Sequence, residues 1–416
     1  MDADEQLPVL EAPREGLPPL VSTAQALDET VGALAAGAGP VAVDAERAQG
    51  FRYSGRAYLL QFRRQGSGTH LVDPIPFADK DPESGLEPLA EALEPTEWIL
   101  HAASQDLPCL RECGLYPHSL FDTELAGRLL GLERVGLGAM IERYFGLTLR
   151  KEHSAANWSM RPLPEDWLVY AALDVELLVE LREVMATELV EAGKDEWARQ
   201  EFDHVLASFA SPAAPRVDPW RRTSGIIQVK SGLGLAVVRE LWQARDEIAR
   251  ANDTAPSKVL PDRAISELAA GITKTGPLPS RHDLRAIEGF RRRQAKRYES
   301  SWVAALDRVA ALPKGGLPPT RSPHTDGPPA PKTWERNAPE AHARWGRVRP
   351  AVNELAEELH LPSENLLTPD TLRRITYAPP DDRSPQGVDE RLDELGSRPW
   401  QRELVVGVLA EGLQDD

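Results

Sequence analysis

The hydrophobic pattern of this 416-residue chain changes partway along it, and the change constrains the fold more than any other feature. Up to about residue 210, short apolar runs of strand length alternate with segments of helical periodicity. The stretch SPAAPRVDPW (211–220), rich in proline and alanine, ends this pattern, and only helical periodicity continues beyond it. We therefore expect an α/β domain followed by all-α domains.

Four runs predict the strands of the α/β domain. VAVDAE (41–46), AYLLQFRR (57–64) and WILHAA (98–103) are apolar runs of strand length, and THLVDP (69–74) alternates between apolar and polar residues. Glycine-containing turns separate the first three runs along the chain. Hairpins followed by a strand that leads into helices predict a mixed sheet flanked by helices.

The helical part of the chain divides at a second proline-rich stretch. Residues 311–333 have no apolar period, so we expect a linker between a first helical block (221–310) and a second helical block (334–416). The two blocks resemble each other, because SKVLPDRAISELAA (257–270) and ENLLTPDTLRRITY (364–377) both place Pro-Asp at the start of a helix. We infer a duplication. The α/β domain then spans 19–210, after an N-terminal tail at 1–18.

Charge is distributed unevenly between the two helical blocks. The whole chain has 48 basic and 65 acidic residues, a net charge of −17. Residues 221–300 nevertheless contain 16 basic and 9 acidic residues, whereas residues 335–416 contain 10 and 17. The first block is therefore predicted to bind a polyanion, and the second mainly to pack or to shape the substrate channel. The alternative for the first block is a helical surface of solvated arginines.

Composition excludes several classes of protein. With 41% hydrophobic and 27% charged residues the chain is not wholly disordered, and no apolar run approaches the ~20 residues of a membrane span. The start, MDADEQLPVLEAPREG, lacks the basic residues of a secretory signal, so we expect a cytoplasmic protein. Cys109 and Cys113 are the only cysteines, which excludes a disulfide framework and leaves buried thiols as the expectation.

Acidic residues occur where surface charge does not explain them. Asp44 and Glu46 lie in an apolar strand, and the period of two places both side chains on one face. Asp106 follows the last predicted strand at the start of a helix, where capping that helix is its alternative role. Asp174 lies in the apolar helix WLVYAALDVELL, four residues after Tyr170 and on the same face. A buried charge there needs a cation or, as the alternative, an arginine partner.

These four carboxylates are expected to converge on divalent cations. Two neighbouring carboxylates repel each other unless a cation or a proton lies between them. Four of them would hold two cations roughly 4 Å apart, the arrangement used for in-line attack on a phosphodiester. Oxygen ligands favour Mg²⁺ or Mn²⁺ over zinc. Tyr170 is placed to orient the attacking water.

The same residues resemble the motifs of the ribonuclease D family, within the DEDD superfamily of 3′-to-5′ exonucleases. VAVDAE provides the first motif with Asp44 and Glu46, HAASQDLPCL the second with Asp106, and YAALDV the third with Tyr170 and Asp174. The tyrosine places the chain in the tyrosine subclass. Segments 121–131 and 157–178 are also similar, so the resemblance covers roughly residues 20–210. Ala45 departs from the threonine that these exonucleases often have, and a hydroxyl contact near the substrate would be lost there.

The resemblance implies a ribonuclease H-like α/β catalytic domain followed by two small all-α domains similar to the helicase-and-RNase-D C-terminal (HRDC) domain. It also implies a metal-dependent 3′-to-5′ exoribonuclease that releases nucleoside 5′-monophosphates from tRNA precursors and other small structured RNAs. Asp44, Glu46, Asp106 and Asp174 would bind the metals and Tyr170 would orient the water. The candidate substrate-binding residues are His101, Gln105, Lys151, Asn157, Trp158, Arg161, Arg291, Arg292 and Arg293.

Three alternative functions remain open on the sequence alone. A 3′-to-5′ DNA exonuclease would use the same motifs, because nothing in them reads the 2′-hydroxyl. An inactive RNA-binding scaffold would keep the fold, although the complete carboxylate set argues against it. The acidic second helical block would suit a protein-interaction role. We expect a monomer with no membrane association.

Overall fold

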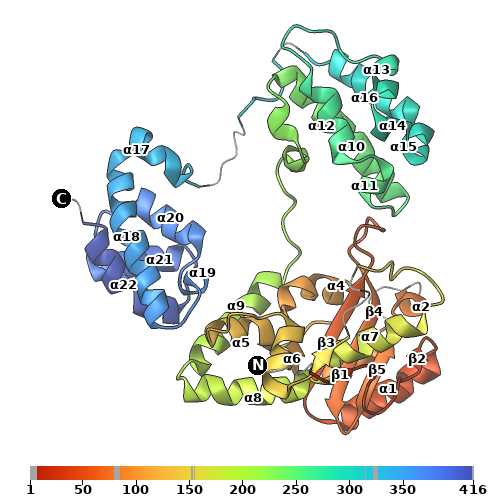
Figure 1. Cartoon of the computed structure of the whole chain (residues 1–416), viewed down its shortest axis with the longest axis vertical. Coiled ribbons are helices and arrows are strands. Elements are labelled where there is room, and N and C mark those ends of the chain that lie inside the picture. The colour runs from red at the N-terminus through yellow and green to blue at the C-terminus, as the bar shows by residue number, and fades with distance from the viewer. Residues whose placement is uncertain are drawn as a thin grey trace, which may run out of the picture.

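The computed structural model (Figure 1) describes residues 7–78, 85–150, 153, 155–313, 315–321 and 327–414. The strands are β1 (Val9–Leu10), β2 (Leu20–Val21), β3 (Ala38–Arg47), β4 (Ala57–Gln65), β5 (Gly68–Val72), β6 (Glu97–Leu100), β7 (Ser119–Asp122) and β8 (Thr148–Leu149). The helices of the α/β part are α1 (Ala24–Ala36), α2 (Ile75–Ala78), α3 (Glu87–Leu93), α4 (Leu107–Glu112), α5 (Thr123–Leu129), α6 (Leu137–Phe145), α7 (Glu165–Glu176), α8 (Leu178–Glu191) and α9 (Asp195–Phe209). The later helices are α10 (Gly232–Ala251), α11 (Pro256–Val259), α12 (Asp262–Ala270), α13 (Arg281–Ala286), α14 (Glu288–Arg291), α15 (Arg293–Arg297), α16 (Glu299–Ala310), α17 (Trp334–Asn337), α18 (Pro339–Glu358), α19 (Ser363–Leu366), α20 (Pro369–Tyr377), α21 (Pro385–Glu394) and α22 (Pro399–Gly412).

A six-stranded mixed sheet in the order β2-β5-β4-β3-β6-β7 forms the centre of the α/β part. The two hairpin pairs β3–β4 and β4–β5 are antiparallel, and β3–β6, β6–β7 and β2–β5 are parallel. All four predicted strands are present. The long strand β3 has a hydrogen-bonded neighbour on each side and a fully buried run at 41–43, so its position is rigidly fixed.

Helices α7 and α8 pack on this sheet. α7 contacts β3, β4 and β5, and α8 contacts β3, β4 and β6. After Pro164 the chain forms three consecutive helices, α7, α8 and α9. The chain turns at Leu177 and again near Gly193, whose positive φ of 65° is a conformation that ends helices. Each turn lets a new helix follow the curved surface of the sheet.

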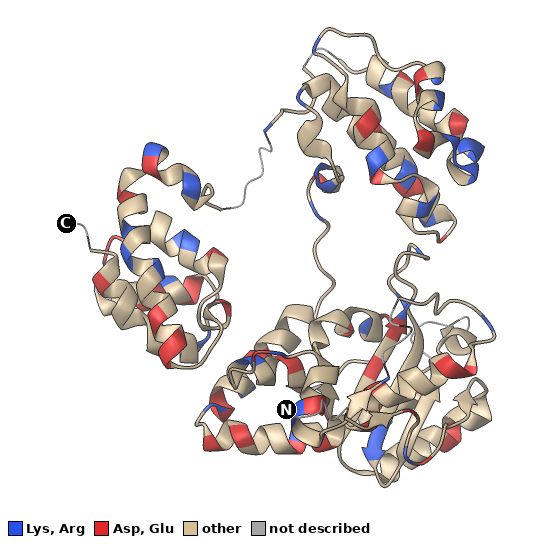
Figure 2. Cartoon of the chain, in the orientation of Figure 1, with Lys and Arg blue, Asp and Glu red and all other residues tan. Residues whose placement is uncertain are grey.

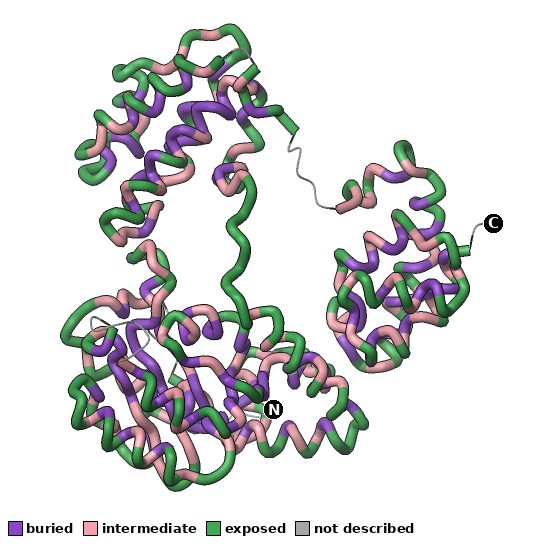
Figure 3. The backbone as a smooth tube through the Cα atoms, turned by 180° about the vertical axis from the view of Figure 1, so that it is seen from behind, coloured by how far each residue is buried: buried purple, intermediate pink, exposed green. Residues whose placement is uncertain are grey.

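The first helical block has a hydrophobic core of its own, and Figure 3 shows buried segments along α10. Exposed residues 211–217 connect it to α9. The block also contacts the hairpin that joins β3 to β4. The Tyr53 hydroxyl donates to the Asp246 carboxylate at 3.0 Å, and Asp253 accepts from the backbone N–H groups of Tyr53 and Ser54. The tip of the β3–β4 hairpin is thereby held by the end of α10 and the residues after it.

The second helical block packs against the α/β part instead. Its buried residues belong to the same hydrophobic cluster as the sheet, and α22 contacts α9. Glu201 of α9 accepts from Arg398 Nε at 2.5 Å and from Trp400 Nε1 at 2.8 Å, while the Trp197 and Trp400 rings stack 4.9 Å apart. This agrees with the prediction that the second block mainly packs.

Three consecutive helices have the same spacing in the two helical blocks, α10 to α12 in the first and α18 to α20 in the second. A helix of 20 residues begins at Gly232 in the first block and at Pro339 in the second. In each block a four-residue helix starts 24 positions later and a nine-residue helix starts 30 positions later. This shared spacing supports the proposal of a duplication.

Two further expectations concern membranes and thiols. Within the described ranges, no helix is both long enough and apolar enough to cross a bilayer. Cys109 is a buried free thiol, as predicted, and Cys113 is half-buried. Burial raises the pKa of the Cys113 thiol to about 11, so this thiol stays protonated and unreactive at neutral pH.

Candidate active site

Strand β3 presents two carboxylates next to each other. Asp44 and Glu46 alternate with buried Ala45, so the pleat places both acidic side chains on one face, as predicted. Asp44 is half-buried and Glu46 is only 8% exposed. Asp44 pairs with Gln61 and Glu46 with Leu59 of β4, so both side chains extend from a backbone that the sheet holds in place.

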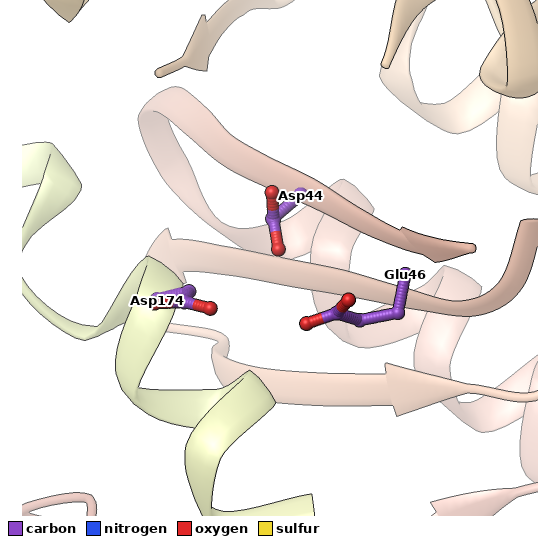
Figure 4. A group of neighbouring side chains, drawn as sticks. All are labelled: Asp44, Glu46 and Asp174. Carbon is purple, nitrogen blue, oxygen red and sulfur yellow. The ribbon is translucent and has the colours of Figure 1, made fainter. Parts of the chain in front are cut away.

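Helix α7 brings the third carboxylate to the strand. Figure 4 shows Asp174 on α7 pointing toward Asp44 and Glu46 on β3. One carboxylate oxygen from each of the three residues lies within 4.8 Å of the others. The sequence separates Asp174 from β3 by more than 120 residues, so only the packing of α7 on the sheet creates this group.

The fourth predicted carboxylate, Asp106, lies beside this group rather than within it. It precedes α4, is 6% exposed, and its side chain makes no hydrogen bond that caps the helix. Its Oδ1 lies 3.7 Å from the Arg47 guanidinium. The negative charges of Asp44 and Asp106 nevertheless raise the pKa values of their neighbours in the cluster, which places Asp106 within electrostatic reach of the other three.

Burial and mutual repulsion raise the pKa of every carboxylate in the cluster. Burial is the largest cause in each case. It raises the pKa of Asp44 to about 6, and burial together with the neighbouring charges raises the pKa of Asp106 to about 8 and of Glu46 to about 10. The pKa of Asp174 also rises well above its usual range. A divalent cation relieves this repulsion, and the oxygen-only donor set fits such a cation.

Tyr170 lies one helical turn before Asp174 and hydrogen-bonds to its carboxylate. Burial and the adjacent negative charges raise the pKa of the phenol far above its usual range. The hydroxyl therefore keeps its proton at neutral pH and donates a hydrogen bond to the Asp174 carboxylate, which suits orienting a water better than removing its proton. Its oxygen lone pairs remain able to accept a hydrogen bond.

Without divalent cations, we expect Glu46→Gln to raise the melting temperature at pH 8 by at least about 3 °C. The pKa of Glu46 is about 10 in the folded chain and near 4.5 when unfolded, so its contribution to stability is full below pH 4.5 and is lost as pH rises toward 10. Glutamine has no ionisable carboxyl group, so the Glu46→Gln variant does not lose stability in this way as the pH rises. Thermal unfolding of both proteins in chelator at pH 5 and pH 8 measures the difference in melting temperature.

Added Mg²⁺ should then stabilise the wild type and leave Glu46→Gln nearly unchanged, because the variant lacks one carboxylate of the cluster. Glu91→Gln, at an exposed position of α3, is the matched control and should behave like the wild type. A Glu46→Gln protein that melts below the wild type in chelator at pH 8 would contradict the repulsion.

The family models that match this chain correspond to the three parts seen in the structure, one α/β part and two helical blocks. Residues 18–190 match the family model described as "3'-5' exonuclease", residues 234–306 match the HRDC domain, and residues 327–413 match the "3' to 5' exonuclease C-terminal domain". Ribonuclease D of Nitrobacter hamburgensis is 27% identical over 359 residues, which cover 83% of this chain and 86% of that protein. Ribonuclease D of Pseudomonas paraeruginosa is 28% identical over 353 residues, which cover 83% and 84%.

This chain belongs to the ribonuclease D family. It is a 3′-to-5′ exoribonuclease with a ribonuclease H-like catalytic domain followed by helical HRDC-type structure. A solved protein from Bifidobacterium adolescentis is 37% identical, with a TM-score of 0.87 over 98% of this chain and 100% of that one. Escherichia coli RNase D, 24% identical, shares the fold with a TM-score of 0.68 over 95% of this chain and 98% of that one.

In this ribonuclease D family member, the HRDC match lies in the first helical block and the match to the exonuclease C-terminal model lies in the second. The prediction of one HRDC domain is thus confirmed for the first block. A second HRDC copy stays a proposal, supported by the equal helix spacing of the two blocks.

The structure corrects two of the predicted substrate contacts. The Trp158 ring is fully buried and packs against Trp167 and Tyr170, so it cannot stack on a nucleobase in this conformation. The Arg161 guanidinium is engaged by the Asp73 carboxylate and by the Tyr58 and Trp158 carbonyl oxygens, which leaves it no free edge for phosphate. Both residues hold the loop before α7 in place.

The other predicted substrate-binding residues are placed differently. Gln105 is exposed beside Asp106, and Asn157 accepts a hydrogen bond from Ser159. Burial lowers the pKa of His101 to about 4, and Nδ1 of its neutral ring lies 2.9 Å from the Thr123 hydroxyl. These contacts favour a structural role for His101 beside the motif that contains Asp106. Lys151 lies outside the described residues. The exposed arginines at 291–293 lie at α14 and α15 of the first helical block.

One residue of the site has a larger role than the sequence indicated. Asp122 caps α5 by accepting from the backbone N–H groups of Glu124 and Leu125. It also accepts from the N–H groups of Ala102 and Ala103, in the turn that leads to Asp106. Ala102 has a positive φ of 60°, so this carboxylate stabilises a strained turn. Period and spacing carry no signal for such a bridge between segments.

Proposed function

We propose that this chain hydrolyses the terminal phosphodiester of RNA at its 3′ end and releases nucleoside 5′-monophosphates, with Asp44, Glu46, Asp106 and Asp174 as metal ligands. The single observation that carries the assignment is the convergence of Asp44, Glu46 and Asp174 oxygens within 4.8 Å beside the Tyr170 phenol. Such a cluster is unfavourable in the absence of a cation and fits one closely.

The donor set supports a two-cation site. Asp44, Glu46 and Asp174 would hold one cation, and Asp106 would complete a second position together with Asp44. Bound cations of this kind lower the pKa of an attacking water and stabilise the leaving oxygen. Carboxylate ligands favour Mg²⁺ or Mn²⁺.

Tyr170 would position the water that attacks phosphorus. Its hydroxyl proton is directed to the Asp174 carboxylate, so its oxygen is left to accept a hydrogen bond from that water. The rigid backbone of α7 keeps the phenol and Asp174 in a constant relation. A group fixed in this way lowers the entropic barrier to attack and does not itself transfer a proton.

The expected substrates are tRNA precursors and other small structured RNAs. The relative from Escherichia coli is described as "an exoribonuclease involved in structured RNA processing". The first helical block supports binding of the RNA body, because Figure 2 shows basic segments gathered around α15. A cytoplasmic location and a monomeric state remain predictions.

The experiment that tests this function is incubation with RNA labelled on its 3′-terminal nucleotide, in chelator, Mg²⁺ or Mn²⁺. We expect labelled nucleoside 5′-monophosphate with either cation and none in chelator. Single-stranded DNA of equal length should react more slowly. Faster DNA hydrolysis would establish the DNA exonuclease alternative, and binding of RNA without any product would establish the scaffold alternative.

Neutralising Arg291, Arg292 and Arg293 together should weaken RNA binding and reduce its dependence on salt. Each lost phosphate contact lowers the slope of log K against log salt by about 0.7 for single strands, so a decrease of up to about 2 is expected. Fluorescence anisotropy at several salt concentrations measures the slope.

A matched triple variant replaces three arginines of the acidic second block, Arg336, Arg349 and Arg391, with glutamine. Its slope should stay at the wild-type value. An equal change in both triple variants would show that net charge, and not the first block, determines RNA binding.

A further inference from the structure

Arg47 directly follows the Asp44-Ala45-Glu46 motif and lies at an irregular point of the sheet. The pairing of β3 with β4 shifts register between Glu46, which pairs with Leu59, and Arg47, which pairs with Ala57. Regular alternation would turn the Arg47 side chain away from the face of Glu46. Register shifts of this kind re-aim side chains and are frequent beside active sites.

The Arg47 guanidinium reaches the carboxylate cluster. Its Nη2 atom lies 3.7 Å from Asp106 Oδ1, and the side chains of Arg47 and Asp106 are 22% and 9% exposed. Because water is largely excluded from this pair, the positive charge of Arg47 acts strongly on its surroundings.

The contact with Arg47 distinguishes Asp106 from the other three carboxylates of the cluster. Its side chain makes no helix-capping hydrogen bond, and it is absent from the group of three whose oxygens lie within 4.8 Å of one another. The cluster therefore has two unequal ends. Asp44, Glu46 and Asp174 form an end with three carboxylates, and Asp44 and Asp106 form an end where a guanidinium already supplies positive charge.

We propose that Arg47 is a positioning residue that holds Asp106 and weakens cation binding at the Asp44–Asp106 end of the cluster until RNA arrives. This inference rests on the proposed two-cation function. A divalent cation entering that end is repelled by the guanidinium. A phosphodiester adds negative charge there, which attracts both the cation and Arg47, so the second cation binds fully only together with the substrate.

Mn²⁺ binding to the RNA-free full chain tests this proposal without any measurement of activity. Calorimetric and electron paramagnetic resonance titrations of the wild type should show one strong and one weaker site. Arg47→Gln should tighten the weaker site at least tenfold and change the stronger one much less. Arg47→Lys keeps the charge and should stay close to the wild type at the weaker site.

Arg52→Gln is the matched control, because Arg52 lies in the same hairpin and donates to Ser159 Oγ. Its Mn²⁺ affinities should equal those of the wild type. Equal affinities of Arg47→Gln and Arg52→Gln at the weaker site would overturn the role of Arg47. The proposed function fails by a different result, which is the absence of cation-dependent nucleotide release by the wild-type chain.

Discussion

Replacing Asp174 with asparagine should reduce nucleotide release from RNA 3′ ends by at least about 10³-fold, or ~4 kcal/mol of transition-state stabilisation. The substitution keeps the shape of the side chain and removes one negative charge from the three-carboxylate group. It also replaces the carboxylate that accepts the Tyr170 hydrogen bond. Both the cation and the orientation of the phenol are therefore affected. Single-turnover hydrolysis of 3′-labelled RNA in Mg²⁺ measures the loss.

Asp166→Asn provides the control for this experiment, since Asp166 lies in the first turn of the same helix with a side chain 48% exposed. It should retain nearly full activity. Asp174→Asn should still fold and bind RNA, because removing one of several repelling carboxylates does not weaken the folded state. Hydrolysis by Asp174→Asn within tenfold of the wild type would refute the assignment of the cluster as the catalytic site.

Replacing Glu201 with alanine should destabilise the contact between α9 and the second helical block by about 3–5 kcal/mol, the usual loss when one partner of a buried ion pair is removed. Glu201 is 6% exposed and accepts two hydrogen bonds from Arg398 and one from Trp400. Alanine would leave the Arg398 guanidinium, 13% exposed, without its carboxylate. Hydrogen exchange in α22 should accelerate as a result.

Glu196→Ala on the same helix is the control, because Glu196 pairs with Arg199 in solvent. Such exposed pairs contribute little to stability. Limited proteolysis gives a second readout, since a released second block should make the linker at 311–333 more susceptible to cleavage. If the Glu201 and Glu196 variants showed the same exchange rates in α22, the ion pair would not hold the block.

Local pattern predicted every strand of five or more residues and one of the two strands with four. The strands around Asp44 and at 57–65 were predicted because each buries a run of apolar residues. The two-residue strands β1, β2 and β8 were not, because two residues cannot show an alternation. Strand β7 has four residues and was also missed; β6 and α9 cover it.

The residues of the cluster were predicted because their signals are local. Asp44 and Glu46 are two positions apart in a strand, and Tyr170 and Asp174 are four apart in a helix, so spacing alone places each pair on one face. The loop at 157–161 gave no such signal. Tryptophan and arginine in a loop suit stacking and phosphate binding, or packing, and composition does not distinguish these roles.

The sequence by itself determined the order of the domains and the candidate carboxylates, because strand and helix periods depend on neighbouring residues. Its motifs indicated the family by resemblance. The tertiary structure decided which partner each charge has. Arg161 binds Asp73 from 88 positions away, Arg398 binds Glu201 from 197 positions away, and Arg47 reaches Asp106 across the end of β6. A charged side chain forms an ion pair with an opposite charge that folding brings within about 4 Å of it. The local hydrophobic period does not predict which residue that partner is.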